Sequence, residues 1–433
     1  MSYILSIEKL SEDNYESWHL QMKAVLVHHD LWEVICDEEA AEKTSEWKKK
    51  DDKAMATIVL SITPVQLSHI KNCKTAKDAW KSLSDIHRPK GPIRKLFRHG
   101  PRTPVDTYPN DPYINETFFP YGWGHLTNDA KKELFKIGNA LAKRYQQLLK
   151  PHYKPDLIYA QSSASPRTLM SMATVLAGML PPVNTPMEWN FKLNWQPIPI
   201  VSIPEEMDIW LRMKVPCPRY DQALNEVLQL PQVKLEIDDH KSLFQELSKI
   251  TGLNITTAAD ITSLYITLLA EQSYGVDLPS WTEDYYPDRM QFMAKQSYIY
   301  NGYTTEMQRL KGGPFLEKIF GQMLAKENGT LLPEERTMFV YCAHDWTITN
   351  VLLALKVWQR QMPRFSALIA FELHQNSETN EYYVEIYFQN DPQLEPQPLT
   401  IPGCSFQCPL HKLLELTEDV MPSTPYEEMC KLK

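Results

Sequence analysis

The sequence predicts an α/β fold, a central sheet flanked by helices, with a helical insertion domain and a small all-α domain before it. Apolar residues recur at helical spacing in the first 88 residues. Later in the chain, short apolar runs end at polar residues, as buried strands do in open α/β sheets. We therefore expect three parts: an all-helical domain over residues 1–88, an α/β domain from residues 89–180 and 303–433, and a mainly helical insertion over residues 181–302.

The helical pattern of the first part has two clear features. Trp18, Met22 and Val25 fall on one face of a helix. Thr75, with Asp78 three residues later, is typical of a capping box that opens another helix. A small helical core explains the tryptophans and leucines of this part better than a binding groove does.

Composition limits the functions that the chain can have. With 433 residues and 43% hydrophobic content, it can build two or three cores. The net charge of −9 argues against a general nucleic-acid surface. The longest nearly apolar stretch, residues 169–180, is too short to span a bilayer, so no membrane partner is expected. The N-terminus shows no signal-peptide pattern, which predicts a cytoplasmic protein.

The segment Arg98–Pro104 places His99 between two arginines on a glycine turn. Arg98 and Arg102 can hold a phosphoryl group with bidentate guanidinium forks. A neutral imidazole between them can attack phosphorus and become a phosphohistidine. Gly100 would let the backbone come close to the ligand. A basic surface turn is the alternative interpretation of this segment.

Two later stretches supply further polar groups. Arg167 follows the apolar run Leu157–Ala160 and opens a helical pattern, and such strand-to-helix junctions favour anions. Without other evidence, a single arginine before a helix is more often a solvated surface charge than a ligand-binding residue. The pair His344–Asp345 ends the apolar run 337–343. A His-Asp dipeptide is weak evidence by itself, since His29–Asp30 is a second one, which we assign to a solvated helix face.

The pattern R-H-G-x-R-x-P, from Arg98 to Pro104, is the signature of the histidine acid phosphatases, which include prostatic, lysosomal and insect venom acid phosphatases. The chain resembles this family from about residue 93 to residue 433, through Asp106–Pro109 and Pro120–Thr127. The resemblance implies the histidine phosphatase fold, with a central mixed sheet. It also implies that the substrate is a phosphate monoester.

The resemblance assigns a role to each of the polar groups. His99 would be the nucleophile, and Asp345 would protonate the leaving alkoxide and later act as the base. The phosphate-binding residues would be Arg98, Arg102, Arg167 and His344. Asp345 must be protonated when substrate is bound, which predicts an acidic pH optimum. No cofactor is expected, and the sequence has no metal-ligand spacing.

Other residues resemble features of secreted or lysosomal members of that family. Cys404 and Cys408 match a short disulfide loop, and Cys217 and Cys430 match a long-range pair. Cys342 is expected to be a small core residue. Seven cysteines leave at least one free thiol. Three glycosylation sequons begin at Asn115, Asn254 and Asn328.

The N-terminus shows no signal-peptide pattern, whereas the cysteines and sequons resemble those of secreted proteins. Both observations are explained if the first part of the chain comes from a different protein family. Leu10–Trp18, Leu31–Val34 and Thr75–Leu83 resemble, in order, the start of a copia-type retrotransposon Gag polyprotein over about residues 1–88. Gag proteins assemble and package RNA, but this chain lacks their Cys/His zinc knuckle. We therefore expect no nucleic-acid partner, while self-association, including a homodimer, stays open.

The sequence at the junction between the Gag-like part and the phosphatase-like part predicts a shortened strand before Arg98. Gly91 and Pro92 disfavour a strand before Arg98, and burying Arg94 or Lys95 unpaired would be costly. The strand that presents His99 is therefore expected to be truncated. Three functions stay open: a working phosphomonoesterase, a catalytically impaired fusion in which the Gag-like part mediates self-association, and a protein that binds phosphate esters without turnover.

Overall fold

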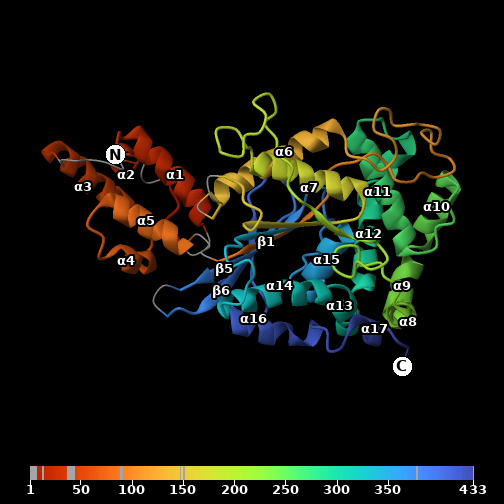
Figure 1. The fold of residues 1–433 in the computed structure, drawn as a ribbon. Helices are drawn as coiled ribbons and strands as arrows, with labels where there is room; N and C mark the ends of the chain where they lie inside the picture. Colours follow the sequence, from red (N-terminus) through yellow and green to blue (C-terminus); the bar gives the residue numbers. More distant parts are fainter. Residues whose placement is uncertain are drawn as a thin grey trace. The chain divides into compact units, whose positions relative to one another are not determined.

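The computed structural model forms two compact units, which are described separately. The first contains Met1–Gly91 and Leu373–Tyr383, and the second contains Pro92–Glu372 and Val384–Lys433. Figure 1 shows the elements of both. Pro89 and Lys90, at the predicted junction, lie outside the described residues. The structure describes residues 7–11, 14–36, 44–87, 91–146, 148–149, 152–376 and 379–432.

The first unit is helical, as its sequence pattern predicts. Trp18 and Met22 are buried in its core, and Trp18 Nε1 donates a hydrogen bond to the carbonyl of Ser61 over 2.8 Å. Thr75 Oγ1 accepts from the backbone N–H of Asp78 over 3.1 Å, which confirms half of the predicted capping box. The helices of this unit are α1 (Tyr15–His28), α2 (Glu33–Cys36), α3 (Ser45–Leu60), α4 (Pro64–Ile70) and α5 (Ala76–His87).

A mixed sheet lies at the centre of the second unit. Within the described residues its strand order is β3-β2-β4-β1-β5-β6-β7, with β8 paired to β6. The first four strands of this order are parallel, and β5 runs antiparallel to β1. The strands are β1 (Ile93–Arg98), β2 (Ile158–Ser163), β3 (Val201–Ile203), β4 (Met338–Ala343), β5 (Leu368–Gln375), β6 (Tyr382–Gln389), β7 (Gln397–Leu399) and β8 (Cys408–Pro409).

Helices cover both faces of this sheet (Figure 1). On one face, α6 (Asn128–Arg144) and α7 (Pro166–Met179) pack against inward-facing residues of β1, β4 and β5. The two helices can approach closely because Gly138 has no side chain. A Cβ atom at this position would lie only 2.2 Å from the carbonyl oxygen of Val175. On the other face, Phe315 of α14 (Gly313–Glu327) contacts the ring of Tyr341 in β4. Figure 1 shows α15 (Asp345–Ala354) and α16 (Leu410–Thr417) on the same side of the sheet as α14.

The region predicted as the insertion is mainly helical and has its own apolar core, which includes Leu247, Leu268 and Met293. A disulfide between Cys217 and Cys430 joins its first helix to the C-terminal segment. No helix among the described residues is long and apolar enough to cross a membrane. The helices here are α8 (Pro218–Leu228), α9 (Pro231–Asp239), α10 (Lys241–Thr251), α11 (Ala258–Tyr274) and α12 (Asp288–Asn301), followed by α13 (Thr305–Lys311) and, near the C-terminus, α17 (Tyr426–Met429).

The expected truncation of the strand before His99 is wrong. β1 spans six residues, pairs with β4 along its whole length and with β5 along most of it, and is buried throughout. Gly91 and Pro92 precede the strand and so do not interrupt it. Lys95 is not unpaired, because its Nζ lies 3.7 Å from a carboxylate oxygen of Glu372 in β5. Arg94 donates to the carbonyl of Pro92 and lies over the ring of Phe339.

A buried carboxyl group between the loop after β1 and the insertion makes stability depend on pH. Glu271 of α11 is 0% exposed. Burial and the neighbouring carboxylate of Asp111 raise its pKa to about 8. The folded chain therefore keeps a proton there that the unfolded chain releases above its ordinary pKa. This contribution to stability is complete below about pH 4.5 and is lost as the pH rises through about 8.

We therefore expect Glu271→Gln, which mimics the protonated acid, to raise the free energy of unfolding at pH 8 by on the order of a few kcal/mol and to change it little at pH 4. Thermal denaturation of both proteins across this range measures the difference. An equal effect at both pH values would contradict the assignment.

Candidate active site

The ends of three parallel strands bring the predicted residues together. β1 and β4 are paired in register so that Arg98 lies beside Ala343, and β2 pairs with the other edge of β4. His99 and His344 therefore leave neighbouring strands at the same edge of the sheet, and their ring centroids lie 5.6 Å apart. Arg167 joins them from the first turn of α7, which follows β2. This is the edge at which open α/β sheets bind ligands.

His99 is held as a neutral base. Its side chain is buried, and Nδ1 lies 2.9 Å from the carbonyl oxygen of Gly100. Because a carbonyl can only accept, Nδ1 carries the proton and Nε2 keeps its lone pair. Burial lowers the pKa of His99 well below its ordinary value, and the charges of Arg98 and Arg167 lower it further. The imidazole is therefore neutral, and its Nε2 lone pair is free.

Gly100 packs closely against the helices behind the turn. A Cβ atom at this position would lie 2.8 Å from a methyl carbon of Leu134 in α6. Its N–H donates to Ser171 Oγ in α7 over 3.1 Å. These contacts anchor the residue after His99 to α6 and α7.

The guanidinium of Arg98 is tightly fixed. One nitrogen donates to the carbonyl of Pro363, and another lies 3.2 Å from Oδ2 of Asp345. Its guanidinium carbon lies 4.3 Å from the centroid of the Phe365 ring, a cation–π distance. Arg102 is also buried and donates to the carbonyl of Thr103 over 2.9 Å.

His344 connects to α7 through a hydroxyl relay. Its Nε2 lies 2.9 Å from Ser163 Oγ, which lies 2.9 Å from Thr168 Oγ1. Thr168 in turn donates to backbone carbonyls, so Ser163 can donate to Thr168 and accept from Nε2. On the other side of the ring, Nδ1 lies 3.4 Å from a guanidinium nitrogen of Arg167. Burial, followed by Arg167, lowers the pKa of His344 well below its ordinary value.

Asp345 is the first residue of α15 and points toward Arg98. Its Oδ1 accepts from the backbone N–H of Trp346 over 2.9 Å, and its Oδ2 accepts from the hydroxyl of Tyr298 over 3.3 Å. Burial by itself would raise the pKa of Asp345, but Arg98 and His344 outweigh it, and the pKa lies below its ordinary value. In the site without a ligand, the carboxyl group is therefore ionised.

Sequence reasoning missed three residues of this site. Ser163 supports His344, Tyr298 of α12 reaches Asp345 from the predicted insertion, and Phe365 lies under the arginines. Ser163 lies between the apolar run Leu157–Ala160 and Arg167, and this position was a usable signal. Tyr298 and Phe365 have no sequence signal, because only the fold brings them to the site.

The predicted cysteine pairs and sequons lie as follows. Cys404 forms a disulfide with Cys408, as Cys217 does with Cys430. Cys342 is a buried free thiol in β4. Each sequon asparagine is exposed, namely Asn115, Asn254 and Asn328.

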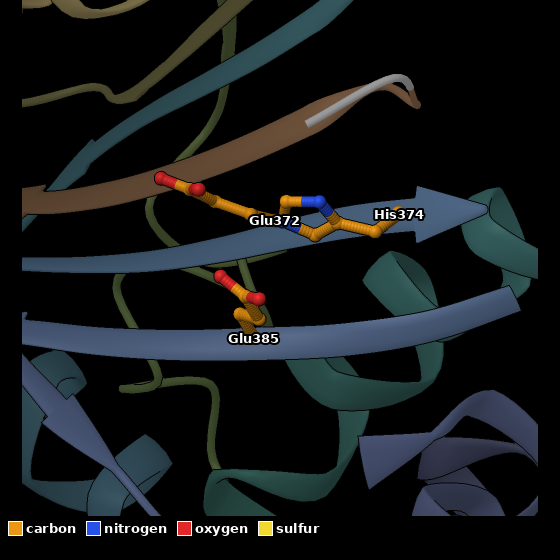
Figure 2. Close-up of side chains that lie close together, drawn as sticks. All are labelled: Glu372, His374 and Glu385. Atoms are coloured by element: carbon orange, nitrogen blue, oxygen red, sulfur yellow. The ribbon is translucent and has the colours of Figure 1, made fainter. Parts of the chain in front are cut away.

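One cluster outside the active site has the composition of a metal site. Figure 2 shows Glu372 and His374 on β5 and Glu385 on β6, whose candidate ligand atoms lie within 4.8 Å of one another. The Glu372 carboxylate already accepts from Tyr145 and Arg144, and it lies beside Lys95. Two cations next to one carboxylate oppose a divalent ion. The cluster fits a buried ion-pair network better than a metal centre.

Comparison with known proteins decides the family. The family described as the histidine phosphatase superfamily (branch 2) matches residues 93–389. This chain belongs to that superfamily. In this histidine phosphatase, His99 and His344 meet at the ends of β1 and β4. The gag-polypeptide of LTR copia-type matches residues 22–99, so both families match residues 93–99.

Curated relatives of this histidine phosphatase are acid phosphatases. Lysosomal acid phosphatase of Homo sapiens is 35% identical over 78% of this chain and 80% of its own length. Venom acid phosphatase of Apis mellifera is 37% identical over 76% of this chain and 85% of its own length. Prostatic acid phosphatase of Homo sapiens is 33% identical over 76% of this chain and 85% of its own length.

Solved structures share the fold at low identity. The phytase from Citrobacter braakii has a TM-score of 0.58 and 15% identity, and the match covers 80% of this chain and 100% of the phytase. The Hafnia alvei phytase in complex with myo-inositol hexakis sulphate has a TM-score of 0.59 and 17% identity, covering 80% and 99%. The α/β histidine phosphatase fold is confirmed.

The relay behind His344 can be tested by binding. Ser163→Ala removes the buried hydroxyl beside Nε2, and an unpaired buried donor costs about 1–3 kcal/mol. We expect affinity for inorganic phosphate, measured by titration calorimetry, to fall by roughly fivefold or more. Ser162→Ala is the control, because that hydroxyl donates to a carbonyl of β2 and has no contact with His344. Equal losses in both variants would show that Ser163 acts only through the strand.

Proposed function

We propose that the protein is an acid phosphatase that hydrolyses phosphate monoesters through a phosphohistidine on His99. The observation that carries the proposal is the neutral imidazole with a free Nε2 among three arginines. Guanidinium groups bind phosphate oxygens with matched geometry, and they stabilise the charge that these oxygens carry in the transition state. The acid phosphatase relatives support the same reaction class.

In the first half of the reaction, Nε2 of His99 attacks phosphorus and the bond from phosphorus to the ester oxygen breaks. Arg98, Arg102 and Arg167 hold the other phosphate oxygens. The negative charge of the bound phosphate raises the pKa of His344, which then takes up a second proton and donates from Nδ1 to one of these oxygens. Asp345 gives its proton to the departing oxygen. In the second half, water attacks the phosphohistidine while Asp345 takes a proton from it, which regenerates His99 and releases phosphate.

The ionised Asp345 of the empty site must gain a proton for the first half. A bound phosphate group carries negative charge and offsets Arg98 and Arg102, which are two of the groups that lower the pKa of Asp345. Substrate binding therefore raises this pKa. Activity should be present in acid and decline as the pH rises above the pKa of Asp345 in the complex.

His99→Ala should abolish hydrolysis of p-nitrophenyl phosphate at acidic pH, because it removes the proposed nucleophile. Acid phosphatase activity of the parent protein, lost in the variant, is the expected result. Rapid mixing of the parent protein with a ³²P-labelled monoester, followed by quenching in base, should also trap label on His99. Activity that survives in His99→Ala would overturn the proposed nucleophile.

Asp345→Asn should affect substrates according to their leaving groups. Loss of a general acid costs roughly 10²–10⁴-fold in rate when the leaving oxygen needs a proton. We expect a loss of this size in kcat for glycerol 2-phosphate, and a smaller loss for p-nitrophenyl phosphate, whose phenolate leaves without help. The same loss for both substrates would exclude Asp345 as the proton donor.

The alternative in which phosphate esters are bound without turnover depended on a truncated strand before Arg98. β1 has six residues and is paired with β4 along its whole length, so that argument no longer applies. No contact among the described residues favours self-association through the Gag-like part over the phosphatase function.

A further inference from the structure

We propose that Tyr298 is a positioning residue for the proton donor: its hydroxyl, beside Arg98, reserves Oδ2 of Asp345 for anchoring, so that Oδ1 carries the proton that is transferred. The proposal rests on the proposed phosphatase function and adds to it a residue from the helical insertion. It gives the two oxygens of one carboxyl group different tasks.

The surroundings of the two Asp345 oxygens differ. Oδ2 accepts from the hydroxyl of Tyr298 over 3.3 Å and lies 3.2 Å from a guanidinium nitrogen of Arg98. Among the described residues, Oδ1 accepts only from the backbone N–H of Trp346, over 2.9 Å. A proton on Oδ2 would face the positive charge of a guanidinium, which cannot accept it, and would displace the hydroxyl hydrogen of Tyr298. A proton on Oδ1 keeps every one of these contacts.

Tyr298 reaches the carboxyl group from a fixed position. The centroid of its ring lies 4.4 Å from that of Trp346 and 6.1 Å from that of Trp358. Three residues later, at the end of α12, Asn301 Nδ2 donates to Oδ1 of Asn350 in α15 over 3.2 Å. The helix of Tyr298 is thus joined to the helix that begins with the proton donor, and the hydroxyl meets Oδ2 without freedom to move elsewhere.

The Tyr298 hydroxyl remains a donor over the working pH range. Its side chain is buried, and burial, followed by the charge of Asp345, raises the pKa of Tyr298 well above its ordinary value. Among the described residues, Asp345 is the one partner of this hydroxyl. Buried hydroxyls are nearly always hydrogen-bonded, so the hydrogen of Tyr298 is directed to Oδ2 of the ionised carboxyl group.

Other groups act on Asp345 through charge and favour neither oxygen by a hydrogen bond. They lie on several elements: Arg98 at the end of β1, Arg102 in the loop after it, Arg167 on α7, Lys214, and the adjacent His344. A bound phosphate group offsets these cations together. The hydrogen bond of Tyr298 differs from them because it marks one oxygen and persists when the phosphate is bound.

Tyr298→Phe removes the hydroxyl and keeps the ring. Because the ionised carboxyl group loses a donor, the pKa of Asp345 rises, and the decline of kcat on the alkaline side should move up by about one pH unit. Oδ2 also becomes open to the proton, which lowers the fraction held on Oδ1. At the acidic plateau, kcat should therefore fall by roughly fivefold for glycerol 2-phosphate, and less for p-nitrophenyl phosphate, whose leaving group needs no proton.

Tyr300→Phe is the matched control, because this tyrosine lies on the same helix and its hydroxyl donates to the carboxylate of Glu236. It should leave the alkaline decline and the ratio of the two kcat values as they are in the parent protein. Three results would overturn the positioning role of Tyr298: an unmoved alkaline decline in Tyr298→Phe, an equal loss for both substrates, or the same changes in Tyr300→Phe.

A measurement without turnover separates this role from the phosphatase function. ¹³C NMR of the aspartate carboxyl groups, with Asp345→Asn to assign the signal, gives the pKa of Asp345 with inorganic phosphate bound. A higher pKa in Tyr298→Phe, found in a parent protein that hydrolyses no monoester, would contradict the phosphatase function and leave the contact standing. Hydrolysis by the parent protein, with the same pKa in both proteins, would overturn the role of Tyr298 alone.

Discussion

The parallel pairing of β1 with β4 is the constraint on which the site depends. The N–H of His99 donates to the carbonyl of Ala343 over 3.0 Å, so the segments that carry the two histidines leave the sheet at a fixed offset. A slip of one residue would turn each side chain to the opposite face of the sheet. The arginines, the hydroxyl relay and Asp345 can surround a single ligand only because this register brings both histidines to one edge.

Burial has two consequences at this edge. It keeps His99 and His344 neutral, and it strengthens the attraction of the arginines for an anion by excluding water. Burial also leaves polar groups without hydrogen bonds, which costs free energy. The Nε atoms of Arg98, Arg102 and Arg167 are buried and have no hydrogen-bond partner. Unsatisfied buried donors of this kind are rare, and they concentrate where a ligand completes the site.

Much of this arrangement could be predicted from the sequence, because the signature around His99 is local and strand ends in α/β sheets converge by rule. The resemblance to the histidine acid phosphatases, which rests on that signature, predicted the fold and grouped Arg98, His99, Arg102, Arg167, His344 and Asp345. By themselves, Arg167 and the His344–Asp345 pair were weak signals. Supports such as Tyr298 and Phe365 could not be predicted, since they arrive from distant loops and helices. The error at β1 arose because the sequence shows the charge of Lys95 but not the carboxylate of Glu372 that faces it across the sheet.

The same strand has a consequence for how such a chain can be assembled. Residues 93–99 are matched by both families, and β1 nevertheless occupies the centre of the sheet. A strand pairs with its neighbours through backbone hydrogen bonds. Pairing therefore constrains the length and direction of the strand more strictly than the identity of its side chains. A segment that two families share can therefore occupy the central strand position of this fold although it buries two cations, of which Lys95 faces the carboxylate of Glu372 and Arg94 meets only the carbonyl of Pro92 and the ring of Phe339.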